Sequence, residues 1–184
     1  MLIQQTYLTN HMTKKQIITI PDDTLRSKSA EIKVFNKDIE KIALDMADTI
    51  ESYGNQNEAG VALAAVQIGY PVRLVVLKED DEFIALANPK VIKKSKSAEE
   101  DLEGCMSVPQ KYGFVMRSKK VKISAQNIKG ENIYLDTDGL MARILQHEID
   151  HLNGILFTDH ITDDNKIYTL SKDGTLINKQ MKTL

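Results

Sequence analysis

The sequence predicts a single α+β domain that spans residues 1–184. A long helical pattern comes first, short β-strand patterns crowd the middle of the chain, and a second helical pattern follows them. This order has no strand–helix–strand alternation, so we expect central antiparallel or mixed β-strands between two helices. A chain of 184 residues with 42% hydrophobic content can bury a core and has the size of one domain.

The first expected helix lies between Phe35 and Gly54. Its apolar residues recur at helical spacing, which predicts a long N-terminal helix with one face packed on the core. Asn36 or Asp38 can cap its start, and Gly54 can end it. The apolar positions are Ile39, Ile42, Met46, Ile50 and Tyr53.

Short strands are expected in the middle of the chain. Stretches rich in aliphatic and β-branched residues are separated there by turn-forming segments that contain Asp, Gly, Pro and Lys. The predicted strands read RLVVL, FIALAN, KVIKKS, VKISAQN and NIYLD, and they follow the small apolar stretch GVALAAVQIG.

The second expected helix carries a metal-binding pattern. The stretch GLMARILQHEIDHLNGILF, residues 139–157, contains His147, Glu148 and His151 as H-E-x-x-H. On a helix, two histidines four residues apart can bind one metal ion while the glutamate serves as a base. Residues 136–138 can cap this helix, and Gly154 can stop it.

Helical spacing places this motif among core positions. Leu140 and Ile144 share a stripe with both histidines, and Glu148 lies on the stripe beside it. Burial of such groups is costly unless each finds a charged or hydrogen-bonding partner, and a metal ion supplies one. We therefore expect a buried metal-binding helix near the C-terminus. The expected polar side holds Arg143, Gln146, Asp150 and Asn153.

A catalytic metal site usually takes three protein ligands, so one more is needed. A metzincin would have its third histidine at position 157, where this chain has Phe157. Asp159 and His160 follow ILF, which resembles a strand, and would need a tight chain reversal. No glutamate follows Phe157. The remaining candidate is Cys105, the only cysteine, because a thiolate is an excellent metal ligand.

Three ordered motifs resemble those of the peptide deformylase family. They are GVALAAVQ at 60–67, EGCMS at 103–107 and QHEIDHLNG at 146–154, within a similarity from about residue 17 to about residue 160. The resemblance implies a hydrolase of protein biosynthesis that removes the formyl group from N-formylmethionine on new polypeptides and releases formate. It also implies one divalent ion per chain, held by Cys105, His147 and His151. Fe²⁺ is the implied metal, and Zn²⁺, Ni²⁺ or Co²⁺ also suit these ligands.

Further roles are expected around the ion. A metal with an open position lowers the pKa of its water, and Glu148 can accept that water's proton and pass it to the departing amine. The resemblance implies that the amide of Gln67 and the backbone N–H of Met106 donate to the oxyanion. Glu103 is a candidate acceptor for a ligating histidine.

Two positions depart from the family pattern. Ala62 replaces the second glycine of the first motif, and Met106 stands where leucine is common. Since the family's peptide substrate runs beside the first motif like a strand, the methyl group of Ala62 can crowd it. The candidate substrate contacts are Gly60, Val61, Ala62, Leu140 and Ile144.

Two other functions stay open at this point. One is an H-E-x-x-H metallopeptidase, and the other is a non-catalytic relative that binds metal or formyl-peptide. Release of formate from formyl-Met-Ala separates them from a deformylase.

The composition of the chain limits the binding partners and the cellular compartment that we expect. A net charge of −2 gives no reason to expect specific nucleic-acid recognition, and no apolar run is long enough to span a membrane. The lone cysteine and the lack of a secretory or transit pattern suggest the cytoplasm. Met12 can be the natural start, which would make residues 1–11 an extension. Residues 161–184 form a polar tail, either a loose arm or a short final element, that is a candidate for a transient ribosome contact.

Overall fold

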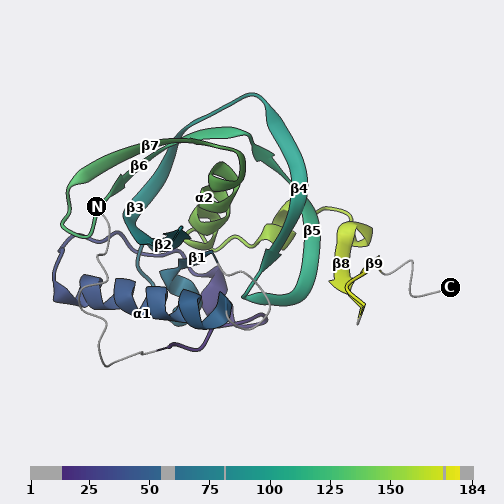
Figure 1. Cartoon of the computed structure of the whole chain (residues 1–184), viewed down its shortest axis with the longest axis horizontal. Coiled ribbons are helices and arrows are strands. Elements are labelled where there is room, and N and C mark those ends of the chain that lie inside the picture. Colours follow the sequence, from purple (N-terminus) through teal and green to yellow (C-terminus); the bar gives the residue numbers. More distant parts are fainter. Residues whose placement is uncertain (1–13, 55–60, 81, 172, 179–184) are drawn as a thin grey trace.

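Two antiparallel β-sheets and two α-helices make up the part of the chain that the computed structural model describes, residues 14–54, 61–80, 82–171 and 173–178 (Figure 1). The expected α+β class is confirmed. The five-stranded sheet has the order β1-β2-β3-β6-β7, and the four-stranded sheet has the order β4-β5-β8-β9. The strands are β1 Ala62–Ala64, β2 Leu74–Glu79, β3 Glu82–Lys94, β4 Ala98–Cys105, β5 Val108–Ser118, β6 Lys120–Gln126, β7 Asn132–Asp138, β8 Ile167–Leu170 and β9 Leu176–Asn178.

The two α-helices cover opposite faces of the five-stranded sheet. Along β2, Leu74 and Val76 belong to the apolar cluster of α1, whereas Val75 and Leu77 belong to the cluster of α2. Successive side chains of a strand point to opposite faces, so a strand buried on both sides reads as a continuous apolar run. The helices are α1 Lys37–Gly54 and α2 Gly139–His151, and the 3₁₀ turns are η1 Asp23–Arg26, η2 Ala65–Ile68, η3 Phe157–His160 and η4 Asp164–Lys166.

Helix α1 begins after Asn36. The side-chain oxygen of Asn36 accepts hydrogen bonds from the backbone N–H groups of Asp38 (3.1 Å) and Ile39 (3.3 Å). Asn36 is therefore the cap, and Asp38 lies inside the helix. Met46 and Ile50 are buried, as the apolar spacing predicts.

Strand β3 replaces two of the strands that the sequence predicts. FIALAN and KVIKKS were expected as separate strands, but β3 runs through both as one element of 13 residues. Asn88 takes a positive φ of 50°, and the pairing with β6 shifts register between Ala87 and Lys90. The turn signal at Asn88 and Pro89 thus marks a β-bulge within one strand.

The β4–β5 hairpin was not among the predicted strands. Its first strand begins with exposed acidic residues and shows no alternation of apolar and polar side chains. The register pairs Glu103 with Gly113 and Cys105 with Val108. This hairpin carries the cysteine to the side of α2 that faces away from the five-stranded sheet, so that α2 lies between the two sheets (Figure 1).

Two residues expected on the polar side of α2 are buried. Arg143 is 9% exposed and Gln146 is 3% exposed. The Gln146 amide donates to the carbonyl of Ser118 at 3.0 Å, and Arg143 donates to Glu103 at 2.7 Å. Arg143 and Gln146 therefore face β4 and β5 instead of solvent, and these partners compensate their burial, whereas Asn153, which lies after the end of α2, is exposed.

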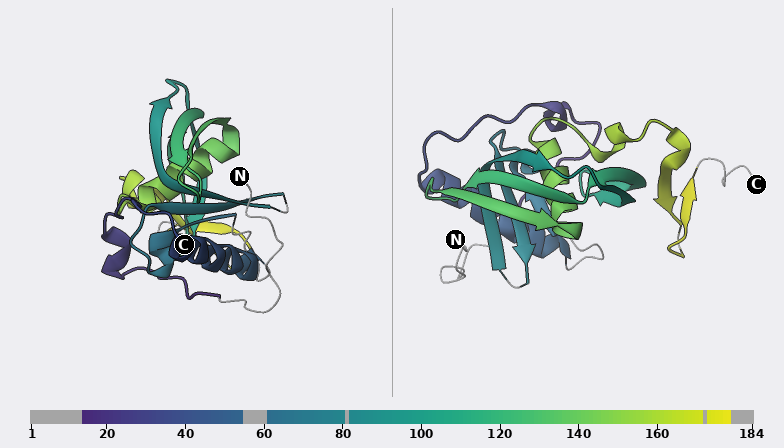
Figure 2. Two further views of the ribbon diagram at one scale, coloured as in Figure 1. Left: turned by 90° about the vertical axis from the view of Figure 1, so that its left-hand side faces the viewer. Right: turned by 90° about the horizontal axis from the view of Figure 1, so that it is seen from above.

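The chain after α2 differs from one expectation and agrees with one of the two alternatives given for the tail. Phe157, at the end of the segment ILF that resembled a strand, begins the 3₁₀ turn η3, and its side chain is 1% exposed. The polar tail supplies the β8–β9 hairpin, which pairs with β5 through Tyr168 and Tyr112 and projects from one end of the molecule (Figure 2). The expected extension, residues 1–11, lies outside the described residues.

Candidate metal centre

Three side chains bring metal-ligating atoms together between β4 and α2. One ligand atom from each of Cys105, His147 and His151 lies within 4.8 Å of the others. The sulfur of Cys105 is 3.2 Å from Nε2 of His151. The two imidazole rings come from successive turns of α2 with centroids 5.0 Å apart. The structure thus assembles the three residues that the sequence predicts as ligands.

Glu103 fixes the orientation of His147. Nδ1 of His147 lies 3.0 Å from a carboxylate oxygen of Glu103, which leaves Nε2 as the free nitrogen. Burial alone would raise the pKa of Glu103, but hydrogen bonds from His147 and Arg117 outweigh it and lower that pKa to about 2. The carboxylate therefore stays charged and accepts from Nδ1–H of His147. Burial alone would lower the pKa of His147, but hydrogen bonds with Cys105 and Glu103 raise it well above the usual value, so a metal ion at Nε2 would replace a proton there.

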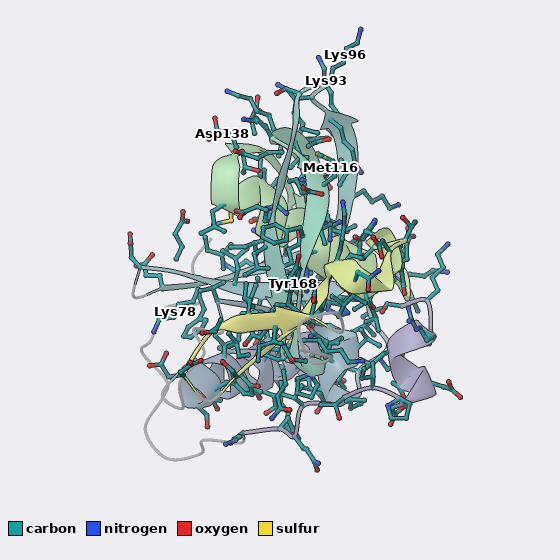
Figure 3. All side chains as sticks on the ribbon, turned by 90° about the vertical axis from the view of Figure 1, so that its right-hand side faces the viewer. Lys78, Lys93, Lys96, Met116, Asp138 and Tyr168 are labelled. Atoms are coloured by element: carbon teal, nitrogen blue, oxygen red, sulfur yellow. The ribbon has the colours of Figure 1, made fainter. Side chains whose placement is uncertain are left out.

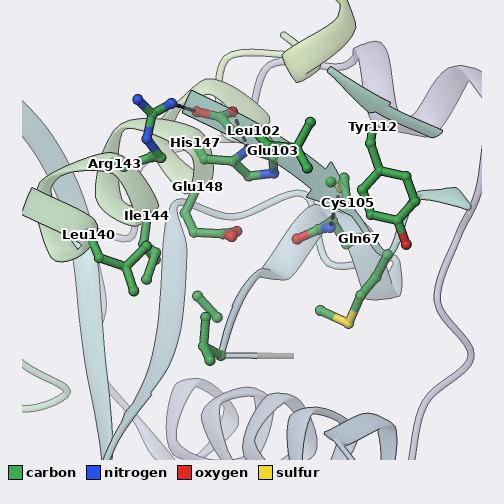
Figure 4. A pocket seen from close by; sticks show the side chains of 14 residues that line it. Gln67, Leu102, Glu103, Cys105, Tyr112, Leu140, Arg143, Ile144, His147 and Glu148 are labelled. Carbon is green, nitrogen blue, oxygen red and sulfur yellow. Dashed lines mark hydrogen bonds and ion pairs between the residues drawn. The ribbon is translucent and has the colours of Figure 1, made fainter. Parts of the chain in front are cut away.

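Two arginines hold this carboxylate in place. Arg117 donates from Nε and Nη2 to the two oxygens of Glu103 at 2.9 and 3.0 Å. Arg143 adds a bond of 2.7 Å, which Figure 4 shows. Sequence reasoning did not assign these arginines to the site. Arg117 lies on the unpredicted β5, and Arg143 had been placed on the solvent side of its helix.

His151 has the protonation state that a metal requires. Burial, together with the nearby His147, lowers its pKa well below the usual value, so the ring is neutral. Its Nδ1 is buried without a hydrogen-bond partner among the described residues. A neutral imidazole with Nε2 directed at a thiol, beside a second oriented imidazole, is a donor set that fits a divalent transition metal.

Glu148 lies in the same buried region. Its side chain is 5% exposed, and one carboxylate oxygen has no partner among the described residues. Burial raises the pKa of Glu148 to about 7, against the attraction of His147. A carboxyl group that titrates near neutrality can both accept and return a proton.

Gln67 points its amide nitrogen at the cysteine. Its Oε1 accepts from the backbone N–H of Ala64 at 2.8 Å, so the nitrogen must lie on the other side. That nitrogen is 3.1 Å from Oγ of Ser107 and 3.6 Å from the sulfur of Cys105. Met106, which joins these two residues, packs its side chain against the α1 cluster, consistent with a role limited to its backbone.

A cavity of about 380 Å³ opens beside these groups (Figure 4). Leu140 is 70% exposed because it lies in the first turn of α2, at the rim, and Val61 is 41% exposed. Ala62 is only 5% exposed and belongs to the core cluster of α2, so little of its methyl group faces the cavity. Gly60 lies outside the described residues. The lining includes Val61, Ala62, Leu140 and Ile144, and also Leu102 and Tyr112, which sequence reasoning missed.

Comparison with known proteins decides the family. The polypeptide deformylase family model matches residues 14–166. The chain belongs to the peptide deformylase family. It is 43% identical over 152 residues to Peptide deformylase 2 of Clostridium acetobutylicum, which covers 83% of this chain and 98% of that relative.

Solved peptide deformylases share the fold. The enzyme from Legionella pneumophila superposes with a TM-score of 0.75 at 36% identity, over 81% of this chain and 86% of that one. The enzyme from Thermotoga maritima gives a TM-score of 0.76 at 32% identity, over 84% of this chain and 100% of that one. The resemblance inferred from three short motifs is therefore confirmed, and it identifies a metal-dependent hydrolase.

None of the helices in the described ranges is long and apolar enough to cross a membrane.

Proposed function

We propose that this peptide deformylase hydrolyses the formyl group of N-formylmethionine on new polypeptides, with one divalent ion held by Cys105, His147 and His151. The convergence of these donors within 4.8 Å carries the proposal. The test is release of formate from formyl-Met-Ala by the metal-loaded protein. A metallopeptidase would instead release amino acids, and a non-catalytic relative would release neither.

The ion, when bound, lowers the pKa of a water molecule and polarises the formyl carbonyl. Glu148 accepts the proton of that water and delivers it to the nitrogen that leaves. Its burial next to His147 keeps the carboxyl group near the ion. One of its oxygens, which has no partner in the part of the chain that the structure describes, is available for the proton. Glu103 keeps His147 in the tautomer that leaves Nε2 for the ion.

Two donors are proposed for the oxyanion. The side-chain N–H of Gln67 is aimed by the bond that its own carbonyl accepts from Ala64. The backbone N–H of Met106 follows the cysteine directly and so stays close to the ion. Donors fixed before the reaction stabilise developing charge without reorganisation.

Gln67→Ala is expected to keep the metal and lose roughly 10²–10³ in turnover, the cost of one oxyanion donor. The measurement is kcat for formyl-Met-Ala with metal content determined on the same sample. Ser107→Ala is the matched control, since it removes a contact of the Gln67 amide but leaves the amide in place. Equal activity of the Gln67 variant and the wild type would remove Gln67 from the mechanism.

The side chain of the substrate methionine is proposed to enter the cavity beside the ion. Val61 and Ile144 supply apolar surface there, Ala62 lies between Val61 and the core, Leu140 lies at the rim, and Gly60 precedes Val61 in the chain. The substrate backbone is proposed to run beside residues 60–62 as an added strand. The small exposed fraction of Ala62 supports the view that its methyl group leaves room for that strand.

Fe²⁺ is proposed as the native metal, with Zn²⁺, Ni²⁺ or Co²⁺ as alternatives in purified protein. We expect protein loaded with ferrous iron under anaerobic conditions to be the most active form and to decay in air, because the iron and the Cys105 thiolate can both be oxidised. Nickel or cobalt forms should resist this decay. Activity before and after exposure to air measures the effect, and mass spectrometry should find oxygen on Cys105 or ferric iron. An iron form that stays fully active in air, or an equally fast zinc form, would contradict the assignment.

The chain acts as one domain. The protein works in the cytoplasm, where formylated nascent chains are its substrate, without specific recognition of nucleic acid. The tail, residues 161–184, makes a transient contact with the ribosome, and its lysines support this idea.

A further inference from the structure

The outer face of the four-stranded sheet continues the wall of the cavity beside the metal centre. Glu103 of β4 pairs with Arg143 of α2 and with Arg117 of β5, so both strands direct these side chains toward the helix. Because side chains alternate along a strand, the residues between them point away from α2. Two of these, Leu102 of β4 and Tyr112 of β5, line the cavity. The same face therefore belongs both to the cavity and to the sheet beyond it.

Gly104 allows the ring of Tyr112 to form part of that wall. The two residues lie opposite each other in the register of β4 and β5. A Cβ atom at position 104 would lie 2.8 Å from Cε1 of Tyr112, so the ring lies directly against the glycine. In the motif EGCMS the glycine thus makes room for an aromatic ring. Tyr112 stands at the end of the cavity opposite Leu140 (Figure 4).

Apolar side chains extend this wall across three strands. Phe114 lies opposite Leu102, and Tyr168 of β8 lies opposite Tyr112. The rings of Phe114 and Tyr168 meet edge to face, with centroids 5.8 Å apart. Figure 3 shows Tyr168 and Met116 from the end of the molecule where the β8–β9 hairpin projects. We call the following set on this face the outer strip: Leu102, Tyr112, Phe114, Met116, Tyr168 and Leu170.

The outer strip exposes much of its apolar surface. Phe114 is 37% exposed, Met116 is 58% exposed and Leu170 is 45% exposed. Eight large hydrophobic side chains are exposed in the described residues, and five of these belong to the outer strip or to the rim of the cavity, where Val61 and Leu140 lie. Exposed apolar side chains that gather beside a cavity mark a binding surface.

We propose that the outer strip binds the third to fifth residues of the formylated polypeptide and favours apolar or aromatic side chains there. The inference rests on the proposed deformylase function, in which the methionine side chain occupies the cavity near Leu140 and Ile144. The polypeptide then leaves the cavity at the opposite end, past Gly104 and Tyr112. Neighbouring strands lie about 4.8 Å apart, so an extended chain crosses from β4 to β8 with about three residues.

The size of the outer strip favours an extended peptide over a second copy of the chain. The strip has six side chains, whereas a stable interface between folded proteins takes about 20–30 residues on each side. An extended peptide needs only the width of one strand. The strip also begins at Leu102 and Tyr112, which line the cavity proposed for the first residue of that peptide.

The test compares formyl-Met-Ala-Gly-Trp-Trp with formyl-Met-Ala-Gly-Ser-Ser as substrates of the metal-loaded protein. Two successive residues differ because side chains of an extended chain alternate, so one of the pair faces the strip. We expect the tryptophan peptide to have a KM lower by roughly three- to tenfold, the range that aromatic contacts contribute. The value of kcat should be the same for both peptides, because this contact is equal in the ground state and the transition state.

Variants of the outer strip show whether it causes the preference. Tyr168→Ala and Phe114→Ala should bring the ratio of the two KM values close to one. The ratio is the measured quantity because a loss of metal or a loosened fold affects both peptides alike. Tyr134→Ala is the matched control, since Tyr134 is an exposed tyrosine on β7 of the other sheet and does not line the cavity. Its ratio should equal that of the wild type.

Fluorescence measures the same contact without turnover. The chain has no tryptophan, so tryptophan emission comes only from the peptide. With the deformylated peptide Met-Ala-Gly-Trp-Trp, the emission should move to shorter wavelength and saturate at one peptide per chain, and Tyr168→Ala should weaken this binding by the same three- to tenfold factor.

Two results separate this inference from the function on which it rests. Formate release from both peptides with equal KM values, or an unchanged ratio in Tyr168→Ala and Phe114→Ala, would overturn the inference, assign the outer strip to another occupant such as a second copy of the chain, and leave the deformylase function in place. No formate from either peptide would contradict the proposed function and this inference with it.

Discussion

Cys105→Ala is expected to abolish stoichiometric metal binding and, with it, the release of formate. The substitution removes one of three converging donors and the only thiolate of the chain. Two imidazoles remain, which is fewer than the three protein ligands that a catalytic site usually takes. Metal analysis after gel filtration, together with activity on formyl-Met-Ala, measures both effects.

The fold should survive this substitution. Glu103, Arg117 and Arg143 connect β4, β5 and α2 by buried ion pairs that do not involve the thiol. Circular dichroism should therefore match the wild type. If the variant kept both metal and activity, Asp159 or His160 would have to replace the cysteine. Both side chains already have partners, since Asp159 pairs with Arg26 and His160 with Asp150.

Glu148→Gln is expected to retain the metal and lose on the order of 10²–10⁴ in turnover, because it removes proton transfer and leaves the three ligands intact. The amide has nearly the same shape as the carboxyl group. The measurement is kcat at matched metal content.

Glu100→Gln serves as the control, because Glu100 is exposed on β4 and does not line the cavity. Its activity should equal that of the wild type. A Glu148→Gln enzyme with wild-type turnover would show that another group moves the proton.

The structure groups Cys105, His147 and His151, as the sequence predicts, because the signals for the two histidines are local. His147 and His151 are four residues apart on a helix, and that spacing alone places both rings on one face. Cys105 was reached by elimination, as the only thiol in the chain. In the structure, the β4–β5 hairpin brings Cys105 to the histidines, and no sequence pattern predicted this hairpin.

The groups that orient the cluster were harder to predict. Arg117 and Arg143 have no motif, and an arginine on the outer side of an amphipathic helix usually faces solvent. Only the docking of β5 and β4 onto α2 turns that side into an interior surface.

The ion pairs around Glu103 have a consequence for how the enzyme acquires its metal. Because three buried side chains already tie the cysteine-bearing hairpin to the histidine-bearing helix, the entropy of bringing the ligands together is lost during folding and not during metal uptake. Zinc fingers, in contrast, fold only when the ion arrives. The deformylase is therefore a preformed receptor for its ion. We therefore expect one metal to exchange for another without refolding of the chain.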